Sequence, residues 1–328
     1  MSSARLTVIG EALIDLVPTG PGQYRAHPGG SPFNVAVALA RLGNRTALMA
    51  RLSDHGFGRL LRETATGEGV DLSASARAAE LTTLAAVSMD MPGQASYEFY
   101  SEGTADWQWS TAELRKRPTD TAVLHFGSIA SWTPPGSKRI DQLVAEARAR
   151  NGVLVSYDPN IRPHLLDAPT RGRRLVERSV RRSHVVKASR EDIEWLYPSR
   201  SVDDIATRWN DLGAELVVVT EGPNGATAFR EGTEALHRPG RAVEVVDTIG
   251  AGDAFTAGLL SGLVRRALHA PQQVAAIPDG ALAEVVDEAV LVSSLTCGRA
   301  GADPPRLASA EIGARSLTVE DFATAAPA

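Results

Sequence analysis

The chain alternates short apolar runs with longer segments in which apolar residues recur every three or four positions. The apolar runs predict strands at 6–10, 46–50, 121–127, 152–157, 184–188 and 216–220. The three-to-four periodicity predicts helices at 34–42, 57–66, 137–150, 170–182, 189–197, 202–212, 251–268 and 281–297. Strands that are apolar on both faces and separated by helices indicate an α/β fold, with a mainly parallel sheet covered on both sides.

Two segments, 11–28 and 81–105, follow a different pattern and alternate apolar with polar residues at period two. This pattern is typical of half-buried strands. We expect the two segments to form a small β-sheet that stands off the main one and acts as a lid over a site. An extra hairpin at the edge of the main sheet is the alternative. Exposed lid edges would favour a homodimer, and residues 1–328 are expected to form a single domain with this lid.

Charge and composition exclude several partners. The 328 residues carry 34 Lys and Arg against 39 Asp and Glu, a net charge of −5, which argues against nucleic acid. Six arginines between 171 and 182 are therefore interpreted as a solvated helix face. No apolar run reaches the about 20 residues that span a bilayer, and Glu11 and Asp15 interrupt the first apolar stretch, unlike an export signal. We expect a cytoplasmic protein without a membrane partner.

The single cysteine, Cys297, can form neither an intramolecular disulfide nor a zinc site by itself. It is interpreted as a small apolar residue of a helix rather than as a nucleophile.

The strongest local signal is the segment DTIGAGDAFTAG, residues 247–258. Gly250, Ala251 and Gly252 open a predicted helix, where free backbone N–H groups can cradle an anion. Asp253 falls in the first turn and could face that anion. A glycine turn followed by an aspartate that the helix dipole favours is the purely structural alternative.

A dinucleotide fingerprint does not fit the same segment. The pattern G-x-G-x-x-G would need glycine at 255, where Phe255 stands, and no Asp or Glu occurs from 254 to 278 to bind a ribose. This disfavours a dehydrogenase. A Walker A pattern is also missing, so any ATP would be bound without a P-loop.

A second signal, PGGSPFNVAVALARLG, covers residues 28–43. Gly29 and Gly30 allow a tight turn against a ligand, and Asn34 is expected to start an apolar helix and offer its amide. Asp15 follows the first strand, at the sheet edge where ligands bind in open α/β folds. Together these groups suggest recognition of hydroxyls.

A third signal, YDPNIRP, covers residues 157–163 and follows a predicted strand. It clusters Asp158, Asn160 and Arg162, and the guanidinium could bind a phosphate or a carboxylate. A turn stabilised by Asp-Pro and Asn remains the structural alternative.

Taken together, GGSPFNVAVALARLG and DTIGAGDAFTAG resemble, in order and separation, the two signatures of the ribokinase-like (phosphofructokinase B type) carbohydrate kinases. Other segments, such as GEALIDLVP, DPNIRP and TEGPNGA, are most similar to the bacterial fructokinase branch. The resemblance implies a three-layer α/β/α fold with a small β lid. It also implies an enzyme that transfers the γ-phosphoryl group of ATP, with Mg²⁺, to a hydroxyl of a neutral sugar, fructose above all. A 2-keto-3-deoxygluconate or nucleoside kinase and a catalytically silent sugar- or nucleotide-binding relative are the alternatives.

The resemblance also implies roles for the residues of the three signals. Asp253 would be the base that accepts the proton of the attacking hydroxyl, and the amides of 250–252 would stabilise charge on the γ-phosphoryl group. The sugar would be held by Asp15, Gly30, Asn34 and Arg162. The nucleotide would be held by Asn160, Thr220, Gly222 and Gly225.

The sequence departs from the family pattern at the ion sites. An N-x-x-E motif that organises magnesium through water is common in the family, and Ser189 and Asp192 stand at its ends here. Aspartate is one methylene shorter than glutamate, which leaves the magnesium role of Asp192 open. Some members bind a monovalent cation such as K⁺ near the base loop, where Asp247 and the 296–301 turn would be its neighbours.

A further departure bears on the substrate. Family members that phosphorylate 2-keto-3-deoxygluconate often carry an arginine after the tyrosine of the lid strand, where it pairs with the substrate carboxylate. Here Tyr100 is followed by Ser101. The missing cation favours a neutral sugar.

Overall fold

The computed structural model describes residues 4–91, 94–150, 152–308 and 315–323, with the backbone alone for 88–91 and 94–97. Its main sheet has eight strands in the order β14-β13-β12-β11-β10-β9-β1-β4. The six strands from β12 to β4 are parallel. Strand β13 runs antiparallel to β12, and β14 runs antiparallel to β13. Their bounds are β1 Arg5–Ile9, β4 Arg45–Met49, β9 Thr121–Gly127, β10 Leu154–Asp158, β11 Val185–Ser189, β12 Leu216–Thr220, β13 Ala226–Phe229 and β14 Leu236–Arg238.

Helices cover both faces of this sheet, as the apolar strands predicted. Successive side chains of a strand enter different layers: Val218 packs with the helices of one face, whereas Val217 and Val219 pack with those of the other. The first layer contains α1 Ser31–Arg41, α2 Gly56–Gly67, α8 Ala251–Arg265, α9 Pro271–Ala275 and α10 Asp279–Cys297. The second contains α3 Thr111–Leu114, α4 Gly136–Ala149, α5 Pro169–Val180, α6 Arg190–Leu196 and α7 Val202–Asp211. The three-layer α/β/α architecture is therefore confirmed.

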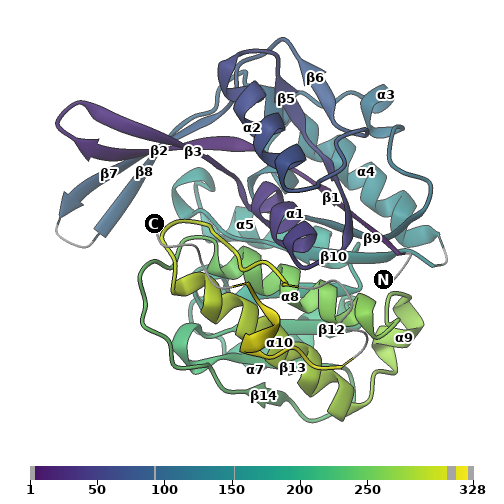
Figure 1. Ribbon diagram of the computed structural model, residues 1–328. Helices are drawn as coiled ribbons and strands as arrows, with labels where there is room; N and C mark the ends of the chain where they lie inside the picture. Colours follow the sequence, from purple (N-terminus) through teal and green to yellow (C-terminus); the bar gives the residue numbers. More distant parts are fainter. Residues whose placement is uncertain (1–3, 92–93, 151, 309–314, 324–328) are drawn as a thin grey trace.

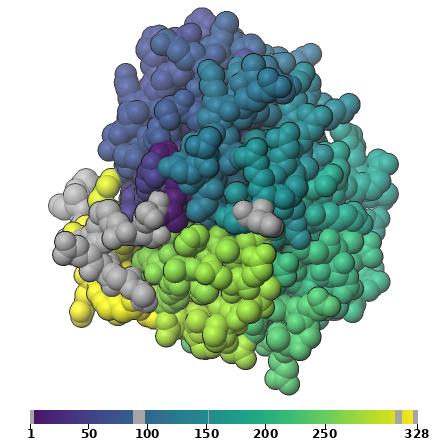
Figure 2. Space-filling model, turned by 90° about the vertical axis from the view of Figure 1, so that its right-hand side faces the viewer, coloured from purple at the N-terminus to yellow at the C-terminus, as the bar shows by residue number. Residues whose placement is uncertain are grey.

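A separate four-stranded sheet, in the order β3-β2-β7-β8, is built from the two segments of period-two alternation. Its strands are β2 Leu13–Gly20, β3 Gln23–Gly29, β7 Leu84–Met91 and β8 Gln94–Tyr100. The sheet extends from the main body as an arm rather than joining the edge of the main sheet (Figure 1). On the side away from the arm, the N-terminal half of the chain forms the upper part of the surface and the segment around α8 and α9 the lower part (Figure 2).

A buried carboxylate fastens the base of the arm. Asp106 accepts hydrogen bonds from the Ala12 N–H at 2.8 Å and the Thr83 hydroxyl at 2.6 Å. It therefore joins the segment before β2 to the segment before β7. Burial raises the pKa of Asp106 to about 6, against the lowering effect of these hydrogen bonds.

The remaining elements are small. Strands β5 Arg51–Ser53 and β6 Ala76–Ala78 form a two-stranded parallel sheet. Short 3₁₀ turns occur at η1 Ala105–Trp107, η2 Ile129–Ser131, η3 Pro163–Leu165, η4 Gly222–Asn224 and η5 Val319–Asp321. Within the described ranges, no helix is long and apolar enough to cross a membrane.

One helix start was predicted wrongly. The apolar helix was expected to begin at Asn34, but α1 begins at Ser31, and Pro32 lies in its first turn. Proline suits that position, since the N–H it lacks would have no partner within the helix. Asn34 is consequently a residue of the first turn, and its side chain projects from the helix start.

Candidate active site

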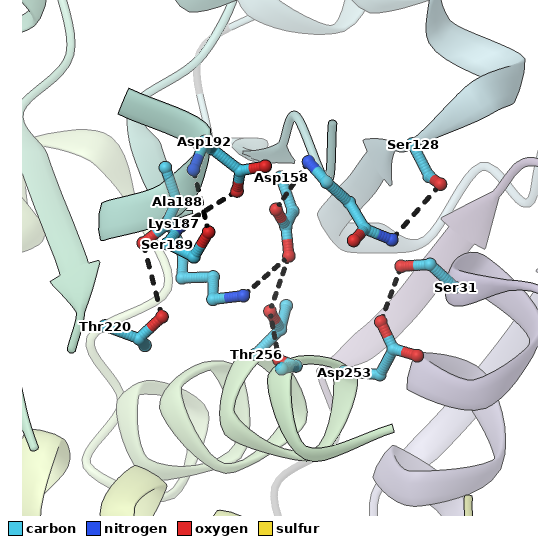
Figure 3. A network of polar contacts seen from close by, with 12 residues as sticks. Ser31, Ser128, Asp158, Lys187, Ala188, Ser189, Asp192, Thr220, Asp253 and Thr256 are labelled. Atoms are coloured by element: carbon cyan, nitrogen blue, oxygen red, sulfur yellow. Dashed lines mark hydrogen bonds and ion pairs between the residues drawn. The ribbon is translucent and has the colours of Figure 1, made fainter. Parts of the chain in front are cut away.

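Two helix starts from opposite ends of the chain meet at the C-terminal edge of the parallel strands. Ser31 and Asn34 lie in the first turn of α1, and Asp253 lies in the first turn of α8. The Ser31 hydroxyl donates to Asp253 Oδ1 at 2.6 Å (Figure 3). The Asn34 amide donates to Asp253 Oδ2 at 2.9 Å. The structure thus joins the two glycine-rich signals of the sequence at a single carboxylate.

The Asp253 carboxylate is shielded from solvent, with 9% of the residue exposed. Burial raises its pKa, and the neighbouring Asp158 charge raises it further. Hydrogen bonds from Ser31 and Asn34 and the charge of Lys187 act in the opposite direction, although burial prevails. A carboxylate in this setting binds a proton more readily than an exposed one, which suits a general base.

Glycine is required just before α8. Gly250 is the N-cap with φ of 74°, and a Cβ there would lie 2.7 Å from the Ala302 Cβ. The Ala251 N–H donates to the Thr248 carbonyl at 3.2 Å, at the long end of the N–H···O range. The start of α8 is therefore a compact turn whose N–H groups and dipole favour an anion.

Asp15, which follows the first strand of the main sheet, lies inside β2 of the smaller sheet, within the segment 11–28 that was predicted to form the lid. Burial raises the pKa of Asp15 to about 6, with a further rise from the Asp253 charge and a lowering effect from Arg162. The Asp15 carboxylate therefore lies within range of both charges. The three residues belong to the arm, the loop after β10 and the start of α8.

Gly30 lets the chain pass close to a buried acid that the sequence analysis missed. Its φ is 99°, and a Cβ there would lie 2.9 Å from the Glu11 carbonyl oxygen. The Glu11 side chain accepts from the Ala130 N–H at 3.0 Å, and burial raises its pKa to about 7. In the sequence, Glu11 could have been singled out because it directly follows an apolar strand.

Arg162 is held by its own loop. Its guanidinium donates to Asn160 Oδ1 at 2.8 Å, and the Asn160 amide donates to the Ser128 hydroxyl at 3.2 Å. Asn160 has φ of 41°, which asparagine tolerates better than most residues. In the structure described here, Asn160 positions Arg162; its contact with a nucleotide stays a prediction.

A buried ion pair lies beside the start of α8. Lys187 Nζ is 3.0 Å from Asp158 Oδ2, and the two side chains are 6% and 2% exposed. The Thr256 hydroxyl lies 3.4 Å from the same Asp158 oxygen (Figure 3). The sequence analysis gave Lys187 no role, although a lysine inside the apolar run HVVKA was a visible signal.

Asp192 caps α6. Its Oδ2 accepts from the Ser189 N–H at 2.9 Å, and the Ser189 hydroxyl accepts from the Asp192 N–H at 3.0 Å, which completes a capping box. Its Oδ1 accepts from the Ile161 N–H at 2.7 Å and so ties the Arg162 loop to α6. Both oxygens therefore already accept a hydrogen bond, and a role in binding magnesium stays a prediction.

The predicted nucleotide segment follows the last parallel strand. Thr220 ends β12, and its hydroxyl donates to the Ala188 carbonyl at 3.4 Å on the neighbouring strand. Gly222 and Gly225 have φ of 56° and 96°, so the turn between β12 and β13 depends on glycine. The turn follows Thr220, which pairs with Ser189 in the register of β11 and β12, so it lies along the same sheet edge.

Asp247 bridges the segment before α8 to the turn after α10. Its carboxylate accepts from the Ile249 N–H at 3.0 Å and the Gly301 N–H at 2.9 Å. The expected neighbourhood of Asp247 and the 296–301 turn is present, whereas a bound cation stays a prediction. Cys297 is the last residue of α10 and is half-buried. The described part of the chain contains no cluster of three or more His, Cys, Asp or Glu that could hold a metal ion.

Comparison with family models and comparison with known protein sequences both identify carbohydrate kinases. A family model described as pfkB family carbohydrate kinase matches residues 3–308. A fructokinase from Rhizobium leguminosarum bv. trifolii is 38% identical over 279 residues, which cover 83% of this chain and 84% of that protein. A fructokinase from Klebsiella pneumoniae is 37% identical and covers 86% of this chain and 91% of its own length.

Solved structures of kinases have a similar fold. A fructokinase from Vibrio cholerae O395, in a form with bound fructose, ADP and calcium, superimposes with a TM-score of 0.80 at 32% identity, over 92% of this chain and 95% of that one. An aminoimidazole riboside kinase from Salmonella enterica, complexed with aminoimidazole riboside and an ATP analogue, gives a TM-score of 0.76 at 28% identity, over 91% and 95%.

Proposed function

Because the chain belongs to the pfkB family of carbohydrate kinases, we propose that it is an ATP-dependent fructokinase. It transfers the γ-phosphoryl group of ATP to a hydroxyl of fructose. The observation that carries this proposal is the Asp253 carboxylate, held by Ser31 and Asn34 at the start of α8. The similarity to fructokinases over more than four-fifths of the chain supports fructose as the sugar.

Asp253 acts as the proton acceptor. Its two hydrogen bonds aim the carboxylate, and its raised pKa keeps it basic enough to take the proton of a sugar hydroxyl. The hydroxyl oxygen then forms a bond to the γ-phosphorus while the bond from phosphorus to the β–γ bridging oxygen breaks. ADP leaves with that electron pair, and the proton remains on Asp253.

The sugar is held between the arm and the body. Asp15 on β2 lies within range of the charges of Arg162 and Asp253, so a sugar bound among them would meet an acceptor and a donor. Gly30 allows the chain close to the ligand, and Asn34 adds its amide. We place the reacting hydroxyl beside Asp253 and the remaining hydroxyls toward Asp15.

The start of α8 receives the phosphoryl group. The N–H groups of Gly250, Ala251 and Gly252 and the dipole of the 15-residue helix stabilise negative charge. The turn with Thr220, Gly222 and Gly225 lies along the nucleotide. Asn160 adds a polar contact from the opposite side.

Two ions belong to this proposal. Mg²⁺ bound with ATP neutralises phosphate charge. Carboxylate oxygens suit Mg²⁺, and because the Asp192 oxygens already accept backbone hydrogen bonds, Asp192 would hold it through water. A K⁺ ion near Asp247 and the 296–301 turn would be coordinated by oxygen ligands of that turn.

The arm works as a lid that closes over the sugar and excludes water, which protects ATP from hydrolysis. Its four strands leave β3 and β8 as edges, and a homodimer through these edges is part of the proposal. Dependence on ATP favours the cytoplasm as the place of action.

The first experiment measures ADP release from MgATP with fructose, 2-keto-3-deoxygluconate, ribose, adenosine or no sugar. Turnover that depends on fructose and is lost in Asp253→Asn supports the proposal. Turnover on another sugar retains the mechanism and corrects the substrate. ATP binding with no turnover on any of them contradicts the proposal and favours a catalytically silent relative.

A further inference from the structure

Lys187 is a buried cation next to the predicted phosphoryl site. It stands on β11, in the middle of the parallel sheet, and its ammonium group is buried against Asp158. Burying both members of an ion pair costs desolvation energy, and well-packed apolar residues are often at least as stable. Stability alone is therefore a weak reason for this pair.

The ammonium group lies against the start of α8. A Cβ built on Gly252 would come within 3.0 Å of Lys187 Nζ, so the ammonium is in contact with the Gly252 backbone. In Figure 3 the Lys187 side chain extends from β11 toward the start of α8. An anion bound by the first N–H groups of α8 would lie within reach of this ammonium.

The charges around the ammonium group of Lys187 keep it protonated, so that it can bind an anion. Asp158, Asp192 and Asp253 all raise the pKa of Lys187, which outweighs the lowering effect of its burial and keeps it charged. Among described residues, Asp158 is its one hydrogen-bond partner, although an ammonium group has three N–H donors. Two donors are therefore available to a ligand.

Lys187 is not the only hydrogen-bond donor near the Asp158 carboxylate. The carboxylate also accepts from the Asn160 N–H at 3.0 Å and lies 3.4 Å from the Thr256 hydroxyl. The carboxylate thus keeps hydrogen bonds when the ammonium also faces a phosphate. The acids near the site would repel a polyphosphate, and Lys187 offsets that repulsion at the α8 end, as Arg162 does on the sugar side.

We propose that Lys187 is a catalytic residue that contacts the γ-phosphoryl group of the nucleotide at the start of α8, with Asp158 holding the ammonium in place. This inference rests on the proposed kinase function. The contact strengthens as charge develops on the transferring group, and it has no counterpart in the ADP complex.

The test uses the fact that the chain has only three lysines: Lys116, Lys138 and Lys187. The parent protein is labelled with ¹³Cε-lysine and titrated with ADP and with the β,γ-methylene analogue of ATP. The Lys187 signal is expected to shift with the analogue and much less with ADP. Lys116 and Lys138 are exposed and serve as internal controls. This measurement needs no variant to fold.

A paired variant gives the kinetic counterpart. Lys187→Met with Asp158→Asn replaces the ion pair by neutral groups of similar size. We expect ADP affinity to stay within about threefold, analogue affinity to fall about tenfold and kcat to fall on the order of 10²-fold. Thr256→Val, which removes only the hydroxyl near Asp158, is the matched control and should keep the ratio of the two affinities.

Two outcomes overturn the inference. Equal shifts of the Lys187 signal with ADP and the analogue would show that the γ-phosphoryl group does not reach the ammonium. A paired variant with parental kcat and parental affinity ratio would show that Lys187 is structural. Failure of the parent to bind either nucleotide would instead contradict the proposed kinase function.

Discussion

Ser31 and Asp253 are 222 residues apart in the chain, yet a 2.6 Å hydrogen bond joins their side chains. Each residue lies in the first turn of its helix, and the two helix starts meet at the C-terminal edge of the sheet. The bond lowers the pKa of a carboxylate that burial raises. Ser31 therefore adjusts the basicity of Asp253 and also fixes its direction.

Replacement of the base is expected to abolish most turnover. Asp253→Asn retains the size and one acceptor oxygen of the side chain but cannot accept a proton, so kcat should fall on the order of 10²-fold or more. Steady-state kinetics with saturating fructose and MgATP measure the effect. Asp211→Asn, at the end of α7 in the opposite layer, is the control and should keep parental kcat. Similar losses in both variants would contradict a specific role for Asp253.

Removal of the Ser31 hydroxyl is expected to move the pH profile. Because the hydrogen bond from Ser31 lowers the pKa of Asp253, Ser31→Ala should raise that pKa. Asp253 acts as a base only when ionised, so the acid limb of kcat/KM should move to higher pH. Profiles between about pH 5 and 9 test this. Ser31→Thr retains a hydroxyl and should move the limb less; an unmoved limb in Ser31→Ala would refute the relationship.

The left-handed turn before α8 should not tolerate a side chain. Gly250→Ala places a Cβ at φ of 74° and 2.7 Å from the Ala302 Cβ, so we expect a loss of roughly 1–3 kcal/mol in the free energy of unfolding. Activity should fall as well, since the helix start must shift. Urea unfolding and kcat are the measurements.

Gly280 provides the matched control for Gly250. It lies in α10, and a Cβ there would meet nothing within 4 Å. Gly280→Ala should stabilise the protein by up to about 1 kcal/mol and leave kcat unchanged, because alanine favours helix. Equal destabilisation by both variants would show that the turn before α8 is not special.

Asp192 is expected to matter for both stability and ions. Asp192→Ala removes the acceptor of two backbone N–H groups, at Ser189 and Ile161, so the free energy of unfolding should fall by about 1–3 kcal/mol. If Asp192 also holds Mg²⁺ through water, the Mg²⁺ concentration for half-maximal activity should rise.

The control for Asp192 is the ordinary cap of α7. The Ser201 hydroxyl accepts from the Asp204 N–H at 3.1 Å, within the first turn of α7. Ser201→Ala should cost about 1 kcal/mol and leave the Mg²⁺ dependence unchanged. An unchanged Mg²⁺ dependence in Asp192→Ala would restrict Asp192 to capping.

A buried histidine predicts loss of stability in acid. His184 Nδ1 accepts from the Val155 N–H at 2.9 Å, which requires the neutral ring, and burial and then Arg148 lower its pKa to about 3. As pH falls below about 6.5, the unfolded chain takes up this proton first, so the folded state loses stability. That loss continues until the pH approaches the folded pKa.

The matched change is His184→Asn, whose side-chain oxygen can still accept from Val155 but does not titrate. The urea midpoint should fall less between about pH 6.5 and 4.5 in this variant than in the parent, by up to about 1.4 kcal/mol per pH unit in free energy. His55→Asn, at an exposed position, should follow the parent. A parent-like decline in His184→Asn would assign the acid sensitivity to other groups.

Local patterns were sufficient to predict the layers. Strands at 121–127 and 216–220 occur at the predicted bounds, because apolar residues on both faces can be buried only inside a covered sheet. The glycine turns before α1 and α8 were also visible, since a positive φ limits the residue type. The place of Asp253 beside such a turn followed from the sequence, whereas its role as the base was implied by the resemblance to carbohydrate kinases.

Tertiary structure alone decided how these parts cooperate. The pairing of Ser31 with Asp253, the effect of the Arg162 and Asp253 charges on Asp15, and the contact of Lys187 with the start of α8 all join distant segments. Sequence patterns report which residues a local element buries or exposes. They do not report which side chains from separate strand ends share one space, because strand order and the path of the arm determine that meeting.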